Sequence, residues 1–323
     1  MMLVRSLERP TSKRKIGPRR QLGILVSLVA VFGVFSILAP SYVSQQNIIN
    51  IVLQASINAI VALGMTVVII TAGIDLSVGS VVALTSVCAG LAMVHGVHIL
   101  LALVLALVLG ALCGTLNGLL ISTLRLQPFL VTLGTMSLVR GVALIVSNGV
   151  PIYGLPREFK AAIGLASIAT IPVPVLIMVA FAVLVFILLR YTMFGEYVFA
   201  MGGNEEATRL SGVPVNRYKV LTYGFSGLAS AIGAIILMGR LGAAEAVSGT
   251  GYELDAIAAA AIGGASLAGG RGSVLGTILG AIILSALRNG LTLMNVASFF
   301  QMVATGAIII LAIIVDSLSR GVE

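Results

Sequence analysis

The stretch YTMFGEYVFAMGGNEEATRLSGVPVNRYK, from Tyr191 to Lys219, is a polar interruption in a chain that is otherwise mostly apolar. It contains the signals that begin and end a short helix: a capping amide, two acids in the first turn, a base in the last turn, then a glycine and a proline. These signals are carried by Asn204, Glu205, Glu206, Arg209, Gly212 and Pro214. A helix of about two turns is marginal alone in water, which indicates that another surface receives it. We interpret the segment as a docking element for a separate polypeptide.

The composition around this segment is that of an integral membrane protein. Hydrophobic residues make up 59% of the 323 residues and charged residues only 9%, and the mean hydropathy is +1.15. Soluble domains have roughly 45–50% apolar and about 25% charged residues. A membrane-spanning helix needs about 20 apolar residues, so a chain of this length has room for about ten spans and no separate soluble domain.

Ten hydrophobic runs predict an all-α bundle of about ten transmembrane helices in contact with lipid. The runs are 22–40, 50–72, 77–94, 98–122, 129–147, 172–190, 219–241, 254–270, 274–290 and 299–316. We expect a basic N-terminal tail (1–21) followed by one transmembrane domain (22–323), from which the docking loop (191–218) projects. The first run is longer than the core of a signal peptide, so we expect it to be retained as a helix.

The distribution of basic residues predicts that both termini are cytoplasmic. If the chain starts inside, 14 of the 19 Lys and Arg fall on the cytoplasmic side, as the positive-inside rule requires. They include seven in the tail and those of the docking loop, which is therefore also expected in the cytoplasm. The net charge of +8 is explained by this topology and not by nucleic-acid binding.

Similar segments indicate two inverted halves, about 22–150 and 170–318. GALCGTLNGLL from Gly110 resembles GTILGAIILSAL from Gly276, five runs later, and GIDLSVGS from Gly73 resembles GYELDAIAA from Gly251. An offset of five spans reverses orientation in the membrane, an arrangement that recurs in transporters. The glycines at spacing four within these segments favour close packing of helices.

Polar residues within the spans are candidates for a translocation path. Asp75, between two glycines, is either a hinge or pore residue or an ordinary cap of the third helix, because a carboxylate at membrane depth must face protein or water. The other candidates either line the path or join helices by hydrogen bonds. They are Gln54, Asn58, Asn117, Arg140 and Asn289.

Two acids and a base on the opposite side of the membrane are candidates for docking an extracytoplasmic partner. Glu253 and Asp255 lie in a predicted outer loop with Arg240 nearby. The alternative is a solvated loop in which Asp255 caps the eighth helix.

The sequence contains no motif for catalysis, metal binding or nucleotide binding. His95 and His98 share a tight turn but have no carboxylate or thiolate beside them, so we predict no metal site. Cys88 and Cys113 lie in apolar runs, where packing explains them. No hydrolase motif and no G-x-x-x-x-G-K-[ST] occurs, so we expect a non-enzyme without its own cofactor. If ATP drives it, another polypeptide must bind the ATP and Mg²⁺.

Four longer stretches resemble one known family. They are ALGMTVVIITAGIDLSVGS from Ala62, YVFAMGGNEEATRLSG from Tyr197, GTGYELDAIAAAAIGGASLAGGRGS from Gly249 and NGLTLMNVASFFQM from Asn289. They look like the permease subunit of bacterial ribose-type monosaccharide ABC importers, within the branched-chain amino acid and sugar permease group. The resemblance runs from about residue 45 to the C-terminus.

This resemblance implies a multi-pass protein of the bacterial inner membrane that imports a monosaccharide. In the family, two permease copies form the pore, a cytoplasmic ATPase drives it, and a periplasmic binding protein delivers the sugar. The docking segment then corresponds to the coupling helix that fits a groove on the ATPase. The positions carried over are Gly202, Gly203, Asn204, Glu205, Arg209 and Gly212.

Two rival functions stay open at this point. An ion-coupled secondary sugar transporter would use Asp75 as its proton or sodium site, although no second buried acid stands at a relay spacing. A membrane scaffold would use the docking segment alone. The sequence decides neither the sugar nor whether the permease pair is a homodimer or a heterodimer.

Overall fold

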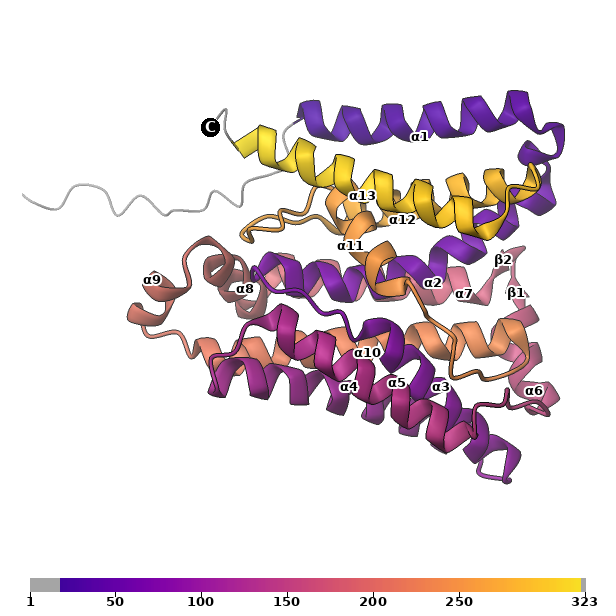
Figure 1. Ribbon diagram of the computed structural model, residues 1–323, viewed down its shortest axis with the longest axis horizontal. Helices are drawn as coiled ribbons and strands as arrows, with labels where there is room; N and C mark the ends of the chain where they lie inside the picture. Colours follow the sequence, from indigo (N-terminus) through magenta and orange to yellow (C-terminus); the bar gives the residue numbers. More distant parts are fainter. Residues whose placement is uncertain (1–17, 321–323) are drawn as a thin grey trace, which may run out of the picture.

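The computed structural model describes residues 18–320 as a bundle of helices with one short hairpin (Figure 1). The first half contains α1 (Pro18–Leu38), a 3-10 turn η1 (Pro40–Val43), α2 (Gln45–Ile70), α3 (Val78–Val94), α4 (Ile99–Thr123) and α5 (Pro128–Ser147). A connection follows with α6 (Arg157–Phe159), a π-helical turn η2 (Lys160–Leu165) and the antiparallel strands β1 (Ser167–Ile168) and β2 (Ile171–Pro172). The second half contains α7 (Val173–Tyr191), α8 (Met193–Gly203), α9 (Glu205–Leu210), α10 (Val215–Leu241), α11 (Tyr252–Ile262), α12 (Val274–Leu293) and α13 (Ser298–Arg320). The predicted basic tail (1–21) lies almost entirely outside the described residues.

The helices follow the ten hydrophobic runs, and this confirms the all-α membrane class. Among residues 18–320, six helices are long and apolar enough to cross a membrane: α2, α4, α5, α7, α10 and α12. Shorter apolar helices occupy Leu22–Leu38, Val78–Val94 and Ser298–Ile308. The count of ten spans stays a prediction.

The eighth predicted span is wrong as a full-length helix. The run 254–270 is helical only as α11, which has 11 residues and a length of about 16 Å against a hydrocarbon core of about 30 Å. Gly264, Gly269 and Gly270 all have positive φ angles, from 72° to 92°, so the chain turns after α11 instead of continuing the helix.

Glycines bring α4 and α10 into the most extensive helix contact of the described chain. A Cβ built on Gly110 would lie 2.5 Å from the Gly227 carbonyl oxygen, one on Gly114 2.0 Å from the Tyr223 carbonyl oxygen, and one on Gly118 2.6 Å from the Val220 Cα. Positions advance along α4 while they recede along α10, so the two helices are antiparallel. This confirms the packing role expected for the repeated glycines.

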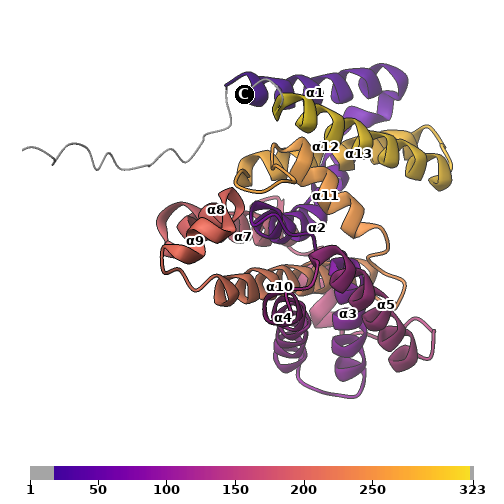
Figure 2. The ribbon, with the colours of Figure 1, turned by 60° about the vertical axis from the view of Figure 1, so that its left-hand side comes forward.

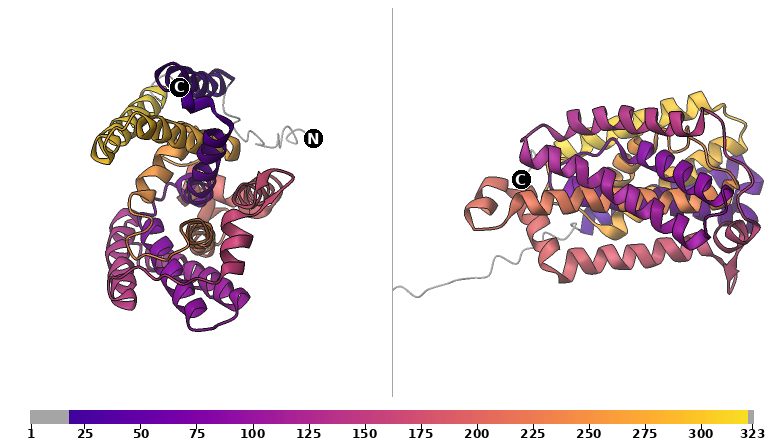
Figure 3. Two further views of the ribbon diagram at one scale, coloured as in Figure 1. Left: turned by 90° about the vertical axis from the view of Figure 1, so that its right-hand side faces the viewer. Right: turned by 90° about the horizontal axis from the view of Figure 1, so that it is seen from below.

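Helix contacts within the described chain form two similar sets, while the division into halves at 22–150 and 170–318 stays a prediction. α4 packs on α10 as its counterpart α12 packs on α2, and α3 contacts α4, α5 and α10 as α11 contacts α12, α13 and α2. α2 and α10 also contact each other and lie centrally in the views of Figures 2 and 3. The outer helices α1 and α7 break the pattern, because α1 packs on α12 whereas α7 packs on α2.

The two ends of the bundle differ in structure. α8 and α9 project from one end, toward which the first turn of α1 and the last turn of α13 also point, and α6 and the hairpin lie at the other end (Figure 1). That this end faces the cytoplasm stays a prediction.

Candidate functional site

The docking segment folds as two helices, and the second begins as the sequence predicts. Asn204 has an extended backbone, and its side-chain Oδ1 accepts a hydrogen bond from the Ala207 N–H at 2.9 Å. Gly212 has a φ of +85°, which ends the helix beyond Leu210. The predicted cap and stop are therefore confirmed. The sequence did not indicate that residues 193–203 form the additional helix α8.

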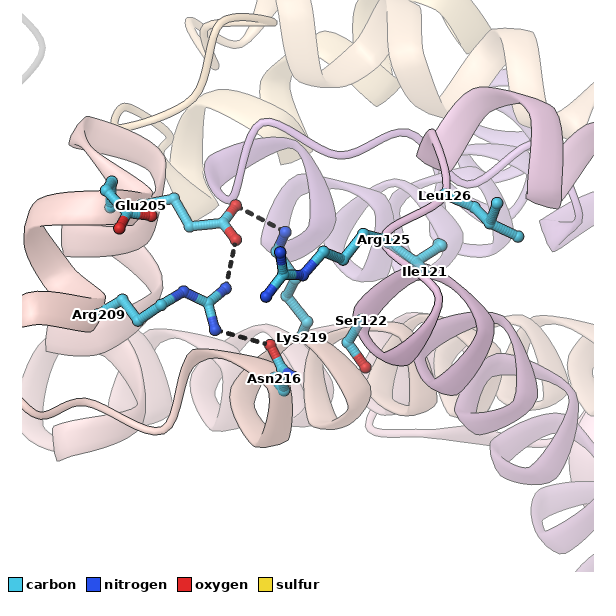
Figure 4. A pocket seen from close by; sticks show the side chains of 9 residues that line it. Ile121, Ser122, Arg125, Leu126, Glu205, Arg209, Asn216 and Lys219 are labelled. Carbon is cyan, nitrogen blue, oxygen red and sulfur yellow. Dashed lines mark hydrogen bonds and ion pairs between the residues drawn. The ribbon is translucent and has the colours of Figure 1, made fainter.

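Glu205 links α9 to the start of α10 (Figure 4). Its carboxylate lies 3.0 Å from Arg209 Nη2 and 2.6 Å from Lys219 Nζ, and Arg209 Nη1 donates to Asn216 Oδ1 at 3.1 Å. Partial burial alone would raise the pKa of the Glu205 carboxyl, but Lys219 and Arg209 hold that pKa below its usual value. The carboxylate is therefore ionised at neutral pH, and the ion pairs hold α9 to α10.

Gly202 brings the backbone of α8 into close contact with two other parts of the bundle. A Cβ on Gly202 would lie 1.7 Å from the Ile70 carbonyl oxygen and 2.4 Å from the Gly270 amide nitrogen. Gly270 N–H in turn donates to the Ile70 carbonyl oxygen at 2.8 Å. The end of α2, the loop after α11 and the end of α8 therefore meet at one point. Gly203 differs, because nothing lies within 4 Å of its Cβ position.

Asp75 is the centre of a buried polar cluster. It is 1% exposed and lies in the link between α2 and α3. Its Oδ1 accepts from the Ser77 hydroxyl at 2.6 Å and from the Ser77 N–H at 3.1 Å, and its Oδ2 accepts from the Ser226 hydroxyl at 2.9 Å. Asn117, on α4, donates its Nδ2 to Ser77 Oγ at 2.9 Å. The cluster joins the α2–α3 link to α4 and α10.

The cluster includes features of both roles expected for Asp75. Its bond to the Ser77 N–H closes a turn just before α3, whose N-cap residue is Ser77, and its bond to Ser226 reaches the other half of the chain. The Asn117 Oδ1 is buried without a hydrogen-bond partner among the described residues. The sequence did not indicate Ser77 and Ser226, because serines in apolar helices are common and have no distinctive spacing.

The remaining path candidates lie in separate places. Asn58 Nδ2 donates to Ser285 Oγ at 3.4 Å, and the side chains of Asn47 and Asn289 bond each other at 2.8 and 3.0 Å. These contacts join α2 to α12, and Gln54 is a half-buried residue of α2. Amide pairs of this kind hold helices together in lipid.

The side chain of Arg140 reaches from α5 to the segment that connects α10 and α11. Its Nη1 donates to the carbonyl oxygens of Ala246 and Ser248 at 2.6 and 2.7 Å. Glu253 Oε1 accepts from the Gly251 N–H at 3.3 Å, and its Oε2 is buried without a hydrogen-bond partner among residues 18–320. Arg240, in the last turn of α10, is half-buried. Neither Glu253 nor Arg240 presents its charge fully to solvent.

The expectation that Asp255 is an exposed loop residue is wrong. It lies in the first turn of α11, is 2% exposed, and pairs through both carboxylate oxygens with Arg288 of α12, the Nη2–Oδ1 distance being 2.6 Å. Arg288 Nη2 also donates to Thr305 Oγ1 of α13 at 3.3 Å. An arginine in an apolar span requires a buried partner, and this was the available signal for the pair.

The described residues show no candidate metal centre. No group of three or more His, Cys, Asp or Glu side chains is close enough to hold an ion within 18–320. The polar groups instead form hydrogen-bonded contacts between helices and line a small hollow beside α9. The projecting segment is joined to α2 through Gly202 and to α10 through Glu205.

A family model described as the branched-chain amino acid transport system, permease component, matches residues 47–313. The chain belongs to this permease family. The match begins inside α2 and ends inside α13, so α1 lies outside it.

Individual permeases are similar over almost the whole chain. The ribose import permease protein RbsC of Bacillus subtilis (strain 168) is 46% identical over 304 residues, which cover 94% of this chain and 92% of that protein. RbsC of Escherichia coli (strain K12) is 43% identical over 296 residues, with 91% and 92% covered. The D-allose transport system permease protein AlsC of the same organism is 35% identical over 297 residues, with 91% and 90% covered. No solved structure matches the chain.

The permease assignment accounts for the apolar bundle and its projecting segment. A permease component is a membrane protein that works with the other components of its transport system. The sites described above are therefore sites of a transport subunit.

Proposed function

We propose that this permease imports a monosaccharide of the ribose type as the membrane subunit of an ABC importer. A separate cytoplasmic ATPase, which binds the ATP and Mg²⁺, drives it, a periplasmic binding protein delivers the sugar, and two copies of this chain form the pore. The permease itself has no catalytic site and no cofactor. The names of the ribose, D-allose and L-arabinose permeases among its relatives support this class of substrate.

The observation that carries the proposal is the attachment of the docking segment to both central helices. Gly202 packs on the last residue of α2, and Glu205 pairs with Lys219 near the start of α10. α2 and α10 are counterparts in the two halves and contact each other. A force applied to α8 and α9 therefore reaches both halves of the bundle through direct contacts.

The mechanism follows from these attachments. Closure of the ATPase domains displaces α9, and with it the ends of α2 and α10, so that the two halves tilt between access states. The α2–α3 link begins directly after Ile70 and moves with it, and Asp75 lies five residues beyond Ile70. The Asp75–Ser226 bond joins this link to α10, so it is a contact across the two halves where the states differ.

Reconstitution tests this proposal against the ion-coupled alternative. Proteoliposomes would contain the permease with its ATPase, the binding protein and radiolabelled D-ribose. We expect uptake only with ATP, and unchanged uptake when an ionophore collapses ion gradients at constant ATP. Uptake by the permease without an ATPase, or uptake abolished by the ionophore, would contradict the proposal.

Deletion of residues 204–211 tests the coupling role separately. We expect the deleted permease to insert normally but to fail in ATP-driven uptake. Arg209→Glu reverses the charge opposite Glu205 and is expected to have the same effect. Normal uptake by the correctly inserted deletion variant would refute the role of α9.

A further inference from the structure

A hollow of about 380 Å³ lies where the C-terminal end of α4, the turn after it, α9 and the start of α10 meet (Figure 4). Three basic side chains line it, Arg125, Arg209 and Lys219, together with two carboxylates and two neutral polar side chains. The carboxylates are those of Glu205 and Glu206, and the neutral groups are those of Ser122 and Asn216. Polar side chains from three separate parts of the chain therefore converge on one space.

The charges around the hollow favour an anionic occupant. Arg209 and Lys219 both pair with the single carboxylate of Glu205, at 3.0 and 2.6 Å. Arg125 brings a third cation into the same space from the opposite side (Figure 4). Glu206 also lines the hollow, so three cations stand against two carboxylates, and an anion balances the one positive charge that is left.

The backbone at Arg125 fixes where its side chain lies. Its φ is +54°, the left-handed conformation in which many helices end, as at Asn148 after α5. The turn after α4 thereby places the guanidinium beside α9 (Figure 4).

The surroundings of the hollow identify the source of the anion. α4 and α10 are apolar and long enough to span, so their paired ends lie at the membrane boundary. Three large apolar side chains next to the hollow are exposed: Leu124 by 61%, Leu126 by 45% and Phe129 by 48%. A ligand with a charged head and an apolar tail fits both surfaces at once.

We propose that this hollow binds the phosphate of an anionic phospholipid headgroup, with the acyl chains against the exposed apolar residues of the turn after α4 and of the start of α5. Guanidinium groups bind phosphate oxygens through paired hydrogen bonds, and Ser122 and Asn216 supply further donors. A bound phosphate competes with Glu205 for Arg209 and Lys219 and therefore weakens the ion pairs that hold α9 to α10. The effect of this weakening on transport rests on the proposed coupling function.

The test measures lipid binding to the purified full-length permease without the ATPase. Phosphatidylglycerol is titrated into protein held in phosphatidylcholine nanodiscs, and bound lipid is counted by native mass spectrometry. We expect saturable binding of phosphatidylglycerol, weakened about tenfold by Arg125→Gln, as expected for loss of a charge-assisted bond. Arg125→Lys keeps the charge and is expected to stay within about threefold of the unaltered protein.

Arg217→Gln is the matched control, because it removes the same charge from an exposed position just outside the hollow. It is expected to change binding less than twofold. Equal binding of phosphatidylglycerol by the Arg125→Gln and unaltered proteins would overturn the proposal. Saturable binding of inorganic phosphate without a preference for phosphatidylglycerol would overturn the assignment to lipid.

A third outcome would also overturn it: Arg125→Gln weakens assembly with the ATPase but leaves lipid binding unchanged, which would make Arg125 a protein contact. Because lipid binding is measured without the ATPase, its failure leaves the coupling role of α9 intact. Failure of the uptake experiments, conversely, leaves the lipid measurement valid.

Discussion

Gly202 lies so close to Ile70 that no other residue fits at position 202. A Cβ there would stand 1.7 Å from the Ile70 carbonyl oxygen, and this oxygen already accepts a hydrogen bond from Gly270. Ile70 is the last residue of α2. The docking segment therefore contacts a spanning helix backbone to backbone, and motion passes between them without flexible side chains.

This contact predicts unequal results at two adjacent glycines. Gly202→Ala forces α8 away from Ile70, so ATP-driven uptake should fall at least about tenfold at normal expression. Gly203→Ala is the comparison: both glycines belong to the expected coupling segment, but nothing in this chain lies within 4 Å of the Gly203 Cβ position, so its loss of uptake should be much smaller. The measurement is uptake in vesicles, corrected for protein amount. Similar activities of the two variants would show that the close contact does not transmit force.

The α4–α10 contact predicts a loss of folding at Gly114. A Cβ on Gly114 would lie 2.0 Å from the Tyr223 carbonyl oxygen, so Gly114→Val must separate the two helices. We expect a destabilisation of about 1–3 kcal/mol or more, measured by thermal unfolding in detergent. Gly134→Val in α5 meets no atom within 4 Å and should unfold like the unaltered protein. Equal midpoints would contradict the packing described here.

The buried cluster around Asp75 predicts a loss of folding stability when the Asp75–Ser226 hydrogen bond is removed. Ser226→Ala leaves one oxygen of a fully buried carboxylate with one donor fewer, at an expected cost of about 1–3 kcal/mol. Ser230→Ala is the control one turn along α10, because the Ser230 hydroxyl donates to the Ser226 carbonyl oxygen, within its own helix, at 3.0 Å. Chemical unfolding of both variants in micelles is the measurement. A smaller effect for Ser226→Ala than for Ser230→Ala would contradict the cluster.

The Asp255–Arg288 pair predicts non-additive substitutions. Arg288→Gln leaves the buried Asp255 carboxylate without its partner and should cost about 3–5 kcal/mol. Asp255→Asn leaves Arg288, whose side chain is 24% exposed, and should cost less. The double variant carries no buried charge and should recover much of this loss. A double-mutant cycle on unfolding free energies measures the coupling. Additive effects would show that the two side chains do not interact.

The Glu205 ion pairs predict that their contribution to folding stability changes with pH only in the acid range. The pKa of this carboxyl is lowered in the folded protein, so its contribution to stability is fully present above the unfolded value of about 4.3 and is lost as pH falls through the folded value. Unaltered protein should exceed Glu205→Gln in thermal midpoint by a small, constant amount from pH 7 to 5, because solvent screens a side chain that is 38% exposed. The difference should disappear at lower pH. A difference that grows on acidification would contradict this sign.

Features that depend on near neighbours in the chain were predictable. Hydropathy indicated the membrane class and the positions of the helices, because burial of apolar residues in lipid depends on each segment alone. The cap at Asn204 and the stop at Gly212 were also predictable, because the groups that form them lie within a few residues of each other.

Contacts between distant residues were decided only by the tertiary structure. Sequence reasoning singled out Asp75, Asp255, Gly202 and Asn289 but could not pair them with the residues they contact. Their partners are Ser226, Arg288, Ile70 and Asn47, which are up to 242 positions away. Hydropathy cannot assign these partners, because lipid-facing and helix-facing sides of a spanning helix are both apolar. The length of α11 depended in the same way on the turn that packing imposes after Ile262. Which faces meet is set by small residues and polar bonds acting across the whole bundle, and these form only once the helices have packed.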